Sequence, residues 1–265
     1  VKSLSLPPKR SPIEVPARPR QHTESDTEMT PTPLDPALRA RLAAIAVPTI
    51  TATLYARGIR NSFLAGLGPL DKSRARFVGT AYTMRALPVR EDLLAAVGSG
   101  EAPNLHRRAM AEVGAGEVVV TDCGANGRIS FFGELIATFL ARKGVAAIVT
   151  DAGIADVGDV ATTGLPVFCL GSAPIPGPAQ RLVGDLQRPV DCMGVTILPG
   201  DVLVGDENGV AAIPRAMAEE VATAAENKSD LEAFLLARLK DGAPLDGTYP
   251  PDEATLAAYA AQKGA

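Results

Sequence analysis

Residues 133–160 read GELIATFLARKGVAAIVTDAGIADVGDV, and this stretch decides the fold. Its Gly-Glu-Leu opening starts an apolar run with helical spacing, and Gly144 ends that run. A short apolar strand follows, and then a turn that carries two aspartates. Because a helix leads directly into a buried strand, the segment predicts an α/β protein with a parallel sheet.

The same alternation continues on both sides of this stretch. Helices are expected at 35–46, 47–59, 91–100, from 105 onward, at 133–143, at 156–164 and, as one or two helices, at 215–242. Strands are expected at 76–88, 117–122, 145–151, 165–171 and in several segments of 177–214, with a hairpin turn at 207–209. A threonine is expected to cap the second helix, Gly58 to end it, and a polar tail to follow residue 242.

The composition fits one large domain behind an unstructured arm. The chain has 265 residues, of which 46% are apolar and none is tryptophan, so small aliphatic side chains must fill the core. Residues 1–33 are rich in proline, serine, arginine and glutamate without an apolar period, which predicts a disordered N-terminal arm. Residues 34–265 are expected to form a single α/β domain that includes the C-terminal helix and tail.

Charge and cysteine usage narrow the class of partner. The net charge is −4 and no basic stripe is present, so we expect no nucleic-acid partner and favour a small-molecule ligand. Cys123, Cys169 and Cys192 form no CxxC pair and are interpreted as reduced, mostly buried thiols. No run approaches the roughly 18 apolar residues that span a bilayer, and no hydrophobic leader is seen, so a cytoplasmic protein without a membrane partner is expected.

The turn after 145–151 predicts a site at one edge of the sheet. In a parallel sheet, the carboxyl end of a strand and the amino end of the preceding helix share an edge, so Asp151 and Asp156 are expected to face Gly133, Glu134 and Leu135. Carboxylates around the amino end of a helix suit Mg²⁺ or Mn²⁺ together with a small anion. The alternative is that Gly133 is only a turn, that Glu134 is a favourable N-terminal charge and that an aspartate caps the next helix.

Other candidate residues lie in neighbouring segments. Residues 120–128, VTDCGANGR, are expected to form a third loop at this edge, with Asn126 in a tight turn as a substrate contact. Arg128 is an anion clamp or, alternatively, a solvated side chain. His106 lies beside two arginines and is expected at the surface, with a catalytic role as the less favoured alternative. The sequence has no GxSxG, HExxH, P-loop or dinucleotide fingerprint.

Several segments together resemble a known family. They read GTAYTMRALP, VVVTDCG, FGELIATFLARKGVAAIVTDAGIAD, LPVF and GVTILPGDVLVGDENGVAAIP. Over about residues 38–245 the chain resembles the RraA-like family. That family includes the 4-hydroxy-4-methyl-2-oxoglutarate/4-carboxy-4-hydroxy-2-oxoadipate aldolases and the regulator of ribonuclease E activity.

The resemblance implies a fold and a site. The fold is a swivelling β/β/α domain, here with a C-terminal helical extension, assembled as a homotrimer or hexamer with the active site between subunits. The aldolases use Mg²⁺ or Mn²⁺. By resemblance, the amides of Gly133, Glu134 and Leu135 bind the carboxylate of pyruvate, and Asp156 holds the metal. Ala155 stands where the aldolases have an arginine, a loss worth several kcal/mol of transition-state stabilisation unless Arg128 or Arg85 substitutes.

These expectations define three functional hypotheses. The first is a divalent-metal-dependent lyase of the aldolase or decarboxylase type. It acts on a 2-oxo acid such as oxaloacetate through a pyruvate enolate, and its catalytic groups are Glu134, Arg128 and Asp156. The second is a non-catalytic regulator that binds another protein, which Ala155 favours. The third is a metal-dependent hydrolase, dehydratase or isomerase of a 2-oxo acid derived from a sugar acid. Glu232 is a further carboxylate that the C-terminal helix could lend to a neighbouring subunit, or an ordinary exposed charge.

Overall fold

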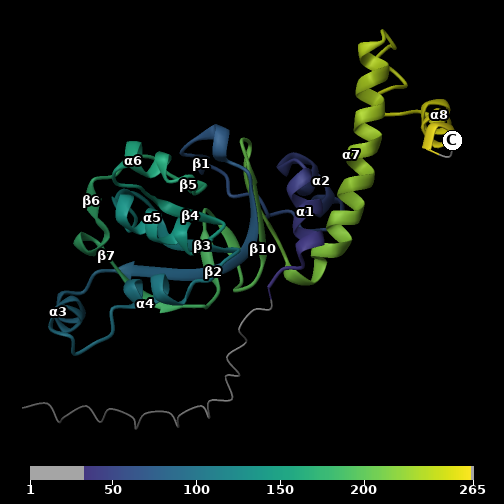
Figure 1. Ribbon diagram of the computed structural model, residues 1–265. Coiled ribbons are helices and arrows are strands. Elements are labelled where there is room, and N and C mark those ends of the chain that lie inside the picture. Colours follow the sequence, from purple (N-terminus) through teal and green to yellow (C-terminus); the bar gives the residue numbers. More distant parts are fainter. Residues whose placement is uncertain (1–32, 264–265) are drawn as a thin grey trace, which may run out of the picture. The chain divides into compact units, whose positions relative to one another are not determined.

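Parallel strands form the centre of the sheet, as their apolar and β-branched residues predict. The computed structural model describes residues 33–263 (Figure 1). The parallel strands are β2 (Phe77–Pro88), β3 (Glu117–Ser130), β4 (Ala147–Gly153) and β5 (Val167–Cys169). The helices that follow strands along the chain place their amino ends at the edge where β3 and β4 end. This is the edge at which open α/β sheets bind ligands.

Further strands extend this centre, most of them antiparallel to their neighbours. The order along the sheet is β1-β5-β4-β3-β2-β10-β11, and β6 and β7 pair with β3 and β2. The added strands are β1 (Gly68–Pro69), β6 (Ile175–Pro176), β7 (Arg181–Leu186), β10 (Val202–Asp206) and β11 (Gly209–Ile213). β8 (Val190–Cys192) and β9 (Val195–Ile197) form a separate hairpin. The turn at 207–209 joins β10 to β11, so the predicted hairpin is confirmed.

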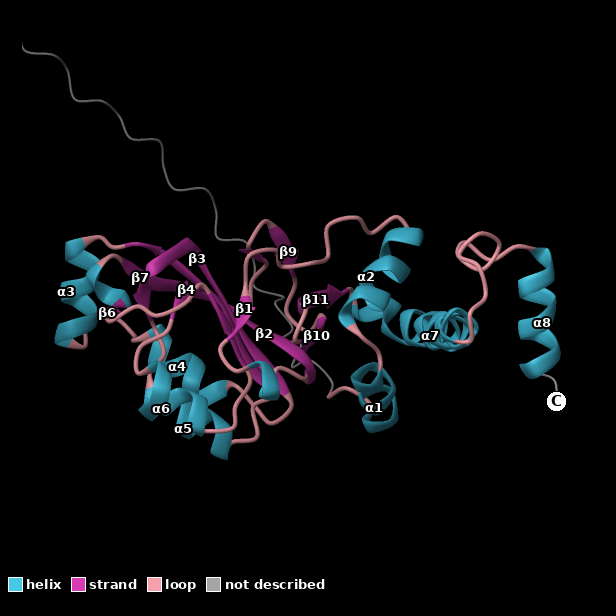
Figure 2. Ribbon diagram, turned by 90° about the horizontal axis from the view of Figure 1, so that it is seen from above, coloured by secondary structure: helices cyan, strands magenta, loops and turns pink. Residues whose placement is uncertain are grey.

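Helices cover the sheet in two groups, which Figure 2 separates clearly. The first group is α4 (Leu105–Glu112), α5 (Glu134–Arg142) and α6 (Val157–Thr162), and it packs on the central strands. The second group is α1 (Pro36–Ala44), α2 (Val47–Ala56) and the first half of α7 (Ala218–Lys240), and it packs on β10 and β11. α3 (Glu91–Ser99) has no fully buried residue. The predicted α/β class with a C-terminal helical extension is confirmed.

The C-terminus differs from expectation. The predicted polar tail includes a helix, α8 (Glu253–Lys263), which contacts the second half of α7 through the rings of Phe234 and Tyr259, 5.4 Å apart, and through Lys263 and Asp230. Most side chains of this alanine-rich helix face solvent. The predicted disordered arm, apart from Pro33, lies outside the described residues.

The cap of α2 also differs from expectation. No threonine caps this helix; instead the buried carboxylate of Asp206, from the β10–β11 hairpin, accepts a hydrogen bond from the amide of Val47 at 2.9 Å. Gly58 follows the helix with φ 85°, as predicted for a glycine that ends a helix. The cap was missed because it comes from a residue far away in the sequence.

Two further expectations concern cysteines and membranes. All three cysteines are buried and unpaired, as predicted. Among residues 33–263, no single helix is both long and apolar enough to cross a membrane; α1 and α2 meet the length and composition criteria only as a pair, with a bend of 103° between them.

Candidate active site

The amino end of α5 and the turn before α6 meet at the carboxyl edge of β3 and β4. The amide of Glu134 donates a hydrogen bond to Asp156 Oδ2 at 3.3 Å. A Cβ added to Gly133 would lie 2.6 Å from the same oxygen. Gly133 has φ −141°, an ordinary extended conformation, so glycine is needed here for space and not for backbone freedom. The structure therefore brings together Gly133, Glu134 and Asp156, as the sequence predicted.

The backbone of Asp156 turns its carboxylate away from its own helix. Asp156 lies at the N-cap position of α6 with φ 51° and ψ 43°, a left-handed conformation, and its side chain does not cap α6. Such a conformation is uncommon outside glycine, although Asp and Asn tolerate it best. The carboxylate is exposed, and its one hydrogen bond within the described residues is the long contact with Glu134. Asp156 is thus a weakly satisfied anion at the positive end of α5.

The first turn of α5 offers further donors. The first hydrogen bond inside the helix runs from the amide of Ala137 to the carbonyl of Gly133, at 3.0 Å. The amides of Glu134, Leu135 and Ile136 precede that bond and have no acceptor within the helix. Asp156 uses one of them. The Glu134 side chain is exposed, and Leu135 is 84% exposed. The arrangement can hold an anion at the helix and a cation beside the carboxylate.

Asp151 has a different role from the one expected. It is 1% exposed, and its carboxylate accepts hydrogen bonds from the amides of Cys123 and Ala125, the latter at 2.6 Å. Burial raises the pKa of this carboxyl to about 6, against the lowering effect of these two hydrogen bonds. Asp151 therefore does not face Gly133. It points to the irregular stretch of β3, which continues to Ser130 where the sequence predicted a loop after residue 122.

Asn126 and Arg128 lie on that stretch of β3. The Asn126 side-chain amide donates to Gln180 Oε1 at 2.9 Å, and its carbonyl oxygen accepts from the backbone amide of Arg128 at 3.2 Å. The expected tight turn is therefore replaced by a strand residue with an Asx-type contact. The Arg128 side chain is exposed. The described contacts do not connect either side chain to Asp156.

Arg85, the second candidate for a substitute clamp, already has partners. Its Nη2 donates to the carbonyl of Pro189 at 2.7 Å, and its guanidinium lies 3.8 Å from Asp122 and 3.9 Å from Asp185. Ala155 places only a methyl group 3.6 Å from the Cβ position of Gly133. Position 155 therefore carries a methyl group where the resemblance implies an arginine.

Glu232, the carboxylate expected on the C-terminal helix, contacts its own chain. It pairs with Lys228 one turn earlier on α7, at 2.9 Å, and lies 3.4 Å from Thr49 Oγ1 on α2. These contacts fit the ordinary reading of a partly exposed helix charge.

His106 is only partly exposed, whereas a surface position was expected. Its ring packs against Phe131 and Phe132, with ring centroids 5.5 and 5.9 Å away, and its Nε2 is buried without a hydrogen-bond partner among the described residues. Burial, reinforced by the charge of Arg107, lowers the pKa of the imidazole. The phenylalanines, distant in sequence from α4, explain why a histidine flanked by arginines is covered.

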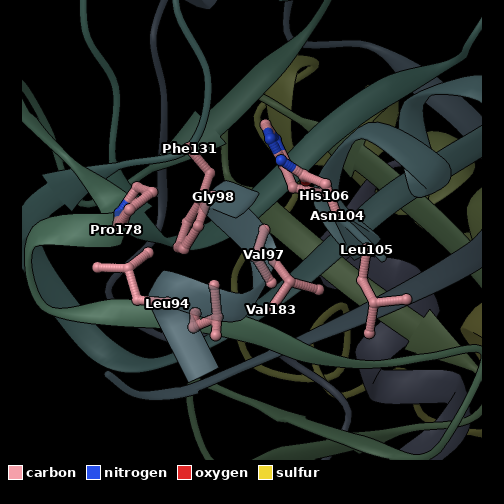
Figure 3. Close-up of a pocket in the computed structure, with 10 residues that line it drawn as sticks. Leu94, Val97, Gly98, Asn104, Leu105, His106, Phe131, Pro178 and Val183 are labelled. Carbon is pink, nitrogen blue, oxygen red and sulfur yellow. The ribbon is translucent and has the colours of Figure 1, made fainter. Parts of the chain in front are cut away.

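A cavity of about 370 Å³ lies beside His106, between α3, α4 and β7 (Figure 3). Its walls are mainly apolar and include Leu94, Val97, Phe131 and Val183. The residues predicted to bind substrate or metal do not line it. An apolar cavity does not suit a small charged ligand, so the edge formed by Gly133 and Asp156 stays the candidate site.

The donor set at this edge fits a hard divalent cation. Residues 33–263 contain no group of three or more histidine, cysteine, aspartate or glutamate side chains placed to hold a metal. Mg²⁺ usually takes one or two carboxylates and fills its remaining positions with water and substrate oxygens. Asp156 supplies one exposed carboxylate, which is compatible with that requirement, whereas a closed zinc site would need more protein ligands.

The sheet and its edge define the class of protein. It is an α/β protein in which a helix amino end and an exposed carboxylate meet outside the carboxyl ends of parallel strands, where open α/β sheets bind ligands. The structure of RraAS2 from Streptomyces coelicolor, described as an unusual member of the RNase ES inhibitor RraA protein family, superposes with a TM-score of 0.69 and 29% identity, over 77% of this chain and 97% of that one.

The chain belongs to the RraA-like family, whose Aldolase/RraA model matches residues 47–212. It is 28% identical over 141 residues to a 4-hydroxy-4-methyl-2-oxoglutarate aldolase of Thermus thermophilus, covering 53% of this chain and 77% of that protein. A relative from Halalkalibacterium halodurans is 32% identical over 121 residues, which cover 46% of this chain. The chain spans 57% of the length of that relative.

Proposed function

We propose that the protein is a divalent-metal-dependent lyase that releases pyruvate from a 4-hydroxy-2-oxo acid or from oxaloacetate. The observation that carries the proposal is the exposed, weakly satisfied carboxylate of Asp156 at the amino end of α5. Membership of a family whose relatives include a 4-hydroxy-4-methyl-2-oxoglutarate aldolase supports the same reaction type.

Each part of the edge has a task in this reaction. Asp156 would hold Mg²⁺ or Mn²⁺; the bound cation would supply positive charge that stabilises the enolate oxygen of pyruvate. The amides of Leu135 and Ile136 bind the substrate carboxylate at the positive end of α5. Arg128, exposed on β3, is the remaining candidate for an anion contact when substrate is bound.

The bond changes follow from this placement. The Glu134 carboxylate accepts the proton of the 4-hydroxyl group, whose oxygen becomes a carbonyl as the bond between C3 and C4 breaks. The electron pair of that bond enters the pyruvate enolate, and protonation at C3 gives pyruvate. With oxaloacetate, carbon dioxide leaves in place of the carbonyl product and no hydroxyl proton is transferred.

The exposure of α5 supports a site shared between subunits. Leu135 is 84% exposed and Phe139, one turn later, is 48% exposed, so a large apolar surface flanks the carboxylate. Such a surface is typical of an interface. We propose that a second copy of the chain covers it in a homotrimer or hexamer.

A second candidate function is a non-catalytic regulator that binds another protein. Ala155 favours it, because the methyl group removes the charged clamp that an aldolase places beside the metal aspartate. In that case the ring scaffold is retained and pyruvate release is absent.

Pyruvate release separates the two functions. The purified protein is incubated with Mg²⁺ or Mn²⁺ and either oxaloacetate or 4-hydroxy-4-methyl-2-oxoglutarate, and pyruvate is measured with a coupled dehydrogenase. We expect pyruvate release faster than the rate that the metal gives without protein. Addition of EDTA should stop this release. Folded protein that releases no pyruvate from either compound under these conditions would exclude the lyase and leave the regulator.

A further inference from the structure

One buried hydroxyl links the two segments that form the candidate site. Ser130 is the last residue of β3 and is 7% exposed. Its Oγ donates to the carbonyl of Phe132 at 2.6 Å and accepts from the amide of Phe132 at 3.2 Å and from the amide of Ala155 at 3.0 Å. Sequence analysis did not select it, because a serine at the end of a strand has no distinguishing pattern.

The partners of Ser130 lie next to the residues that carry the chemistry. Phe132 immediately precedes Gly133, and Ala155 immediately precedes Asp156. The amide of Ala155 also donates to the carbonyl of Phe132 at 3.1 Å. Ser130 is therefore joined to both segments, within two residues of the Asp156 carboxylate on one side and of the Glu134 amide on the other.

We propose that Ser130 is a positioning residue that fixes the Asp156 carboxylate relative to the first amides of α5. The inference rests on the proposed function, since it assigns Ser130 a task in the same site. A hydroxyl suits this task because it donates and accepts at the same time. Alanine can do neither, cysteine does both weakly, and threonine does both well.

Small displacements matter at such a site. Productive geometries must be held to within about 0.5 Å, and a misplacement of about 1 Å can cost roughly 100-fold in rate. Asp156 has a single long hydrogen bond of its own, so its position depends on the backbone of Ala155. Loss of the Ser130 hydroxyl leaves the Ala155 amide with the Phe132 carbonyl as its remaining acceptor and so loosens that backbone without removing any proposed ligand.

The experiment compares Ser130→Ala, Ser130→Cys and Ser130→Thr with a matched control. The control is Thr150→Val, which removes another buried hydroxyl near the same edge, one that accepts from the amide of Ala152 at 3.2 Å. Three quantities are measured: Mn²⁺ affinity by electron paramagnetic resonance, hydrogen exchange at the amides of Phe132 and Ala155, and kcat and KM for pyruvate release.

We expect Ser130→Ala to weaken Mn²⁺ binding about 10-fold or more and to speed exchange at both amides. Loss of a group that orients a metal ligand typically costs about 10- to 100-fold in metal affinity. Ser130→Cys should be intermediate, and Ser130→Thr should restore both quantities. Thr150→Val should leave Mn²⁺ affinity unchanged. If Ser130→Ala does not fold, the Cys and Thr variants carry the comparison.

The outcomes distinguish the two proposals. Pyruvate release with native Mn²⁺ affinity in Ser130→Ala would overturn the role of Ser130 and leave the lyase intact. Mn²⁺ affinity that depends on Ser130, in a protein that releases no pyruvate, would uphold the positioning role and reject the lyase. A native protein that binds no Mn²⁺ would overturn both.

Discussion

Two helices of this protein begin at a carboxylate from another segment, and the two carboxylates differ in almost every other respect. Asp206 is 0% exposed, and its oxygens accept from the amide of Val47 at the start of α2 and from the backbone and side-chain amides of Asn208, at 2.8–3.0 Å. Asp156 is exposed at the start of α5 and accepts one hydrogen bond at 3.3 Å.

The difference separates a structural carboxylate from one available to a ligand. Both exploit the positive amino end of a helix. Asp206 has its hydrogen-bonding capacity filled by the protein, so it stabilises the contact between α2 and the β10–β11 hairpin. Asp156 keeps acceptor capacity that only solvent, a cation or a partner can use. Variants at the two positions should therefore affect different quantities.

The largest effect is expected from Asp156→Asn. Loss of the charge that holds the cation should lower kcat/KM for pyruvate release about 1000-fold, which corresponds to ~4 kcal/mol. The free energy of unfolding should change by less than about 0.5 kcal/mol, as for other exposed positions. Steady-state kinetics and urea unfolding measure the two quantities. A variant with native kinetics would remove Asp156 from the mechanism.

Asp206→Ala should show the opposite pattern. Truncation leaves the buried amide of Val47 without an acceptor and removes the contacts with the exposed Asn208, which should cost about 3 kcal/mol in the free energy of unfolding. The kcat of the folded fraction should be unchanged. Urea unfolding and kinetics on the same preparation check both; a fall in kcat without a loss of stability would contradict the structural assignment.

Asp151 provides a test through pH. Its pKa is raised to about 6 from an ordinary value of 3.8, so the folded state binds the proton more tightly than the unfolded state. Stability from this group is therefore greatest below pH 4 and declines as the pH rises through 6. Between pH 4 and 7, the free energy of unfolding of the native protein should fall by on the order of 2 kcal/mol relative to that of Asp151→Asn. A stability difference that stays constant over this range would contradict the raised pKa.

Gly133→Ala should give the smallest of these effects. The added methyl group would lie 2.6 Å from Asp156 Oδ2 and must displace the carboxylate. We expect about a 10-fold loss in kcat/KM, or ~1.4 kcal/mol. Gly158→Ala is the matched control, because a Cβ there meets no atom within 4 Å. Equal activities for the two variants would show that the space beside Gly133 is not needed.

Local pattern predicted much of this molecule, because helix and strand periodicity survive in the folded chain. The helix at 133–143, the strand after it and the hairpin at 207–209 are all confirmed. The meeting of Gly133 with Asp156 follows from one rule about parallel sheets, and it is confirmed as a placement. The roles of these residues in binding and catalysis stay predictions.

The rest depends on contacts between distant residues. Asp151 and Asp156 look alike in the sequence, yet one is covered by the bent end of β3 and the other is exposed. The ring of His106 is partly covered by two phenylalanines from another segment. Ser130 acquires its contact with Ala155 only when β3 and β4 are paired. Periodicity does not encode such contacts, so these assignments required the structure.

A crystal structure with Mn²⁺ and oxalate would test the central claim most directly, since anomalous scattering locates the metal. We predict Mn²⁺ at an Asp156 carboxylate oxygen, at about the 2.0–2.2 Å expected of such ligands, and an oxalate carboxylate at the amides of Leu135 and Ile136. An Asp156 that keeps its hydrogen bond to Glu134 while Mn²⁺ binds elsewhere, or does not bind, would contradict the account.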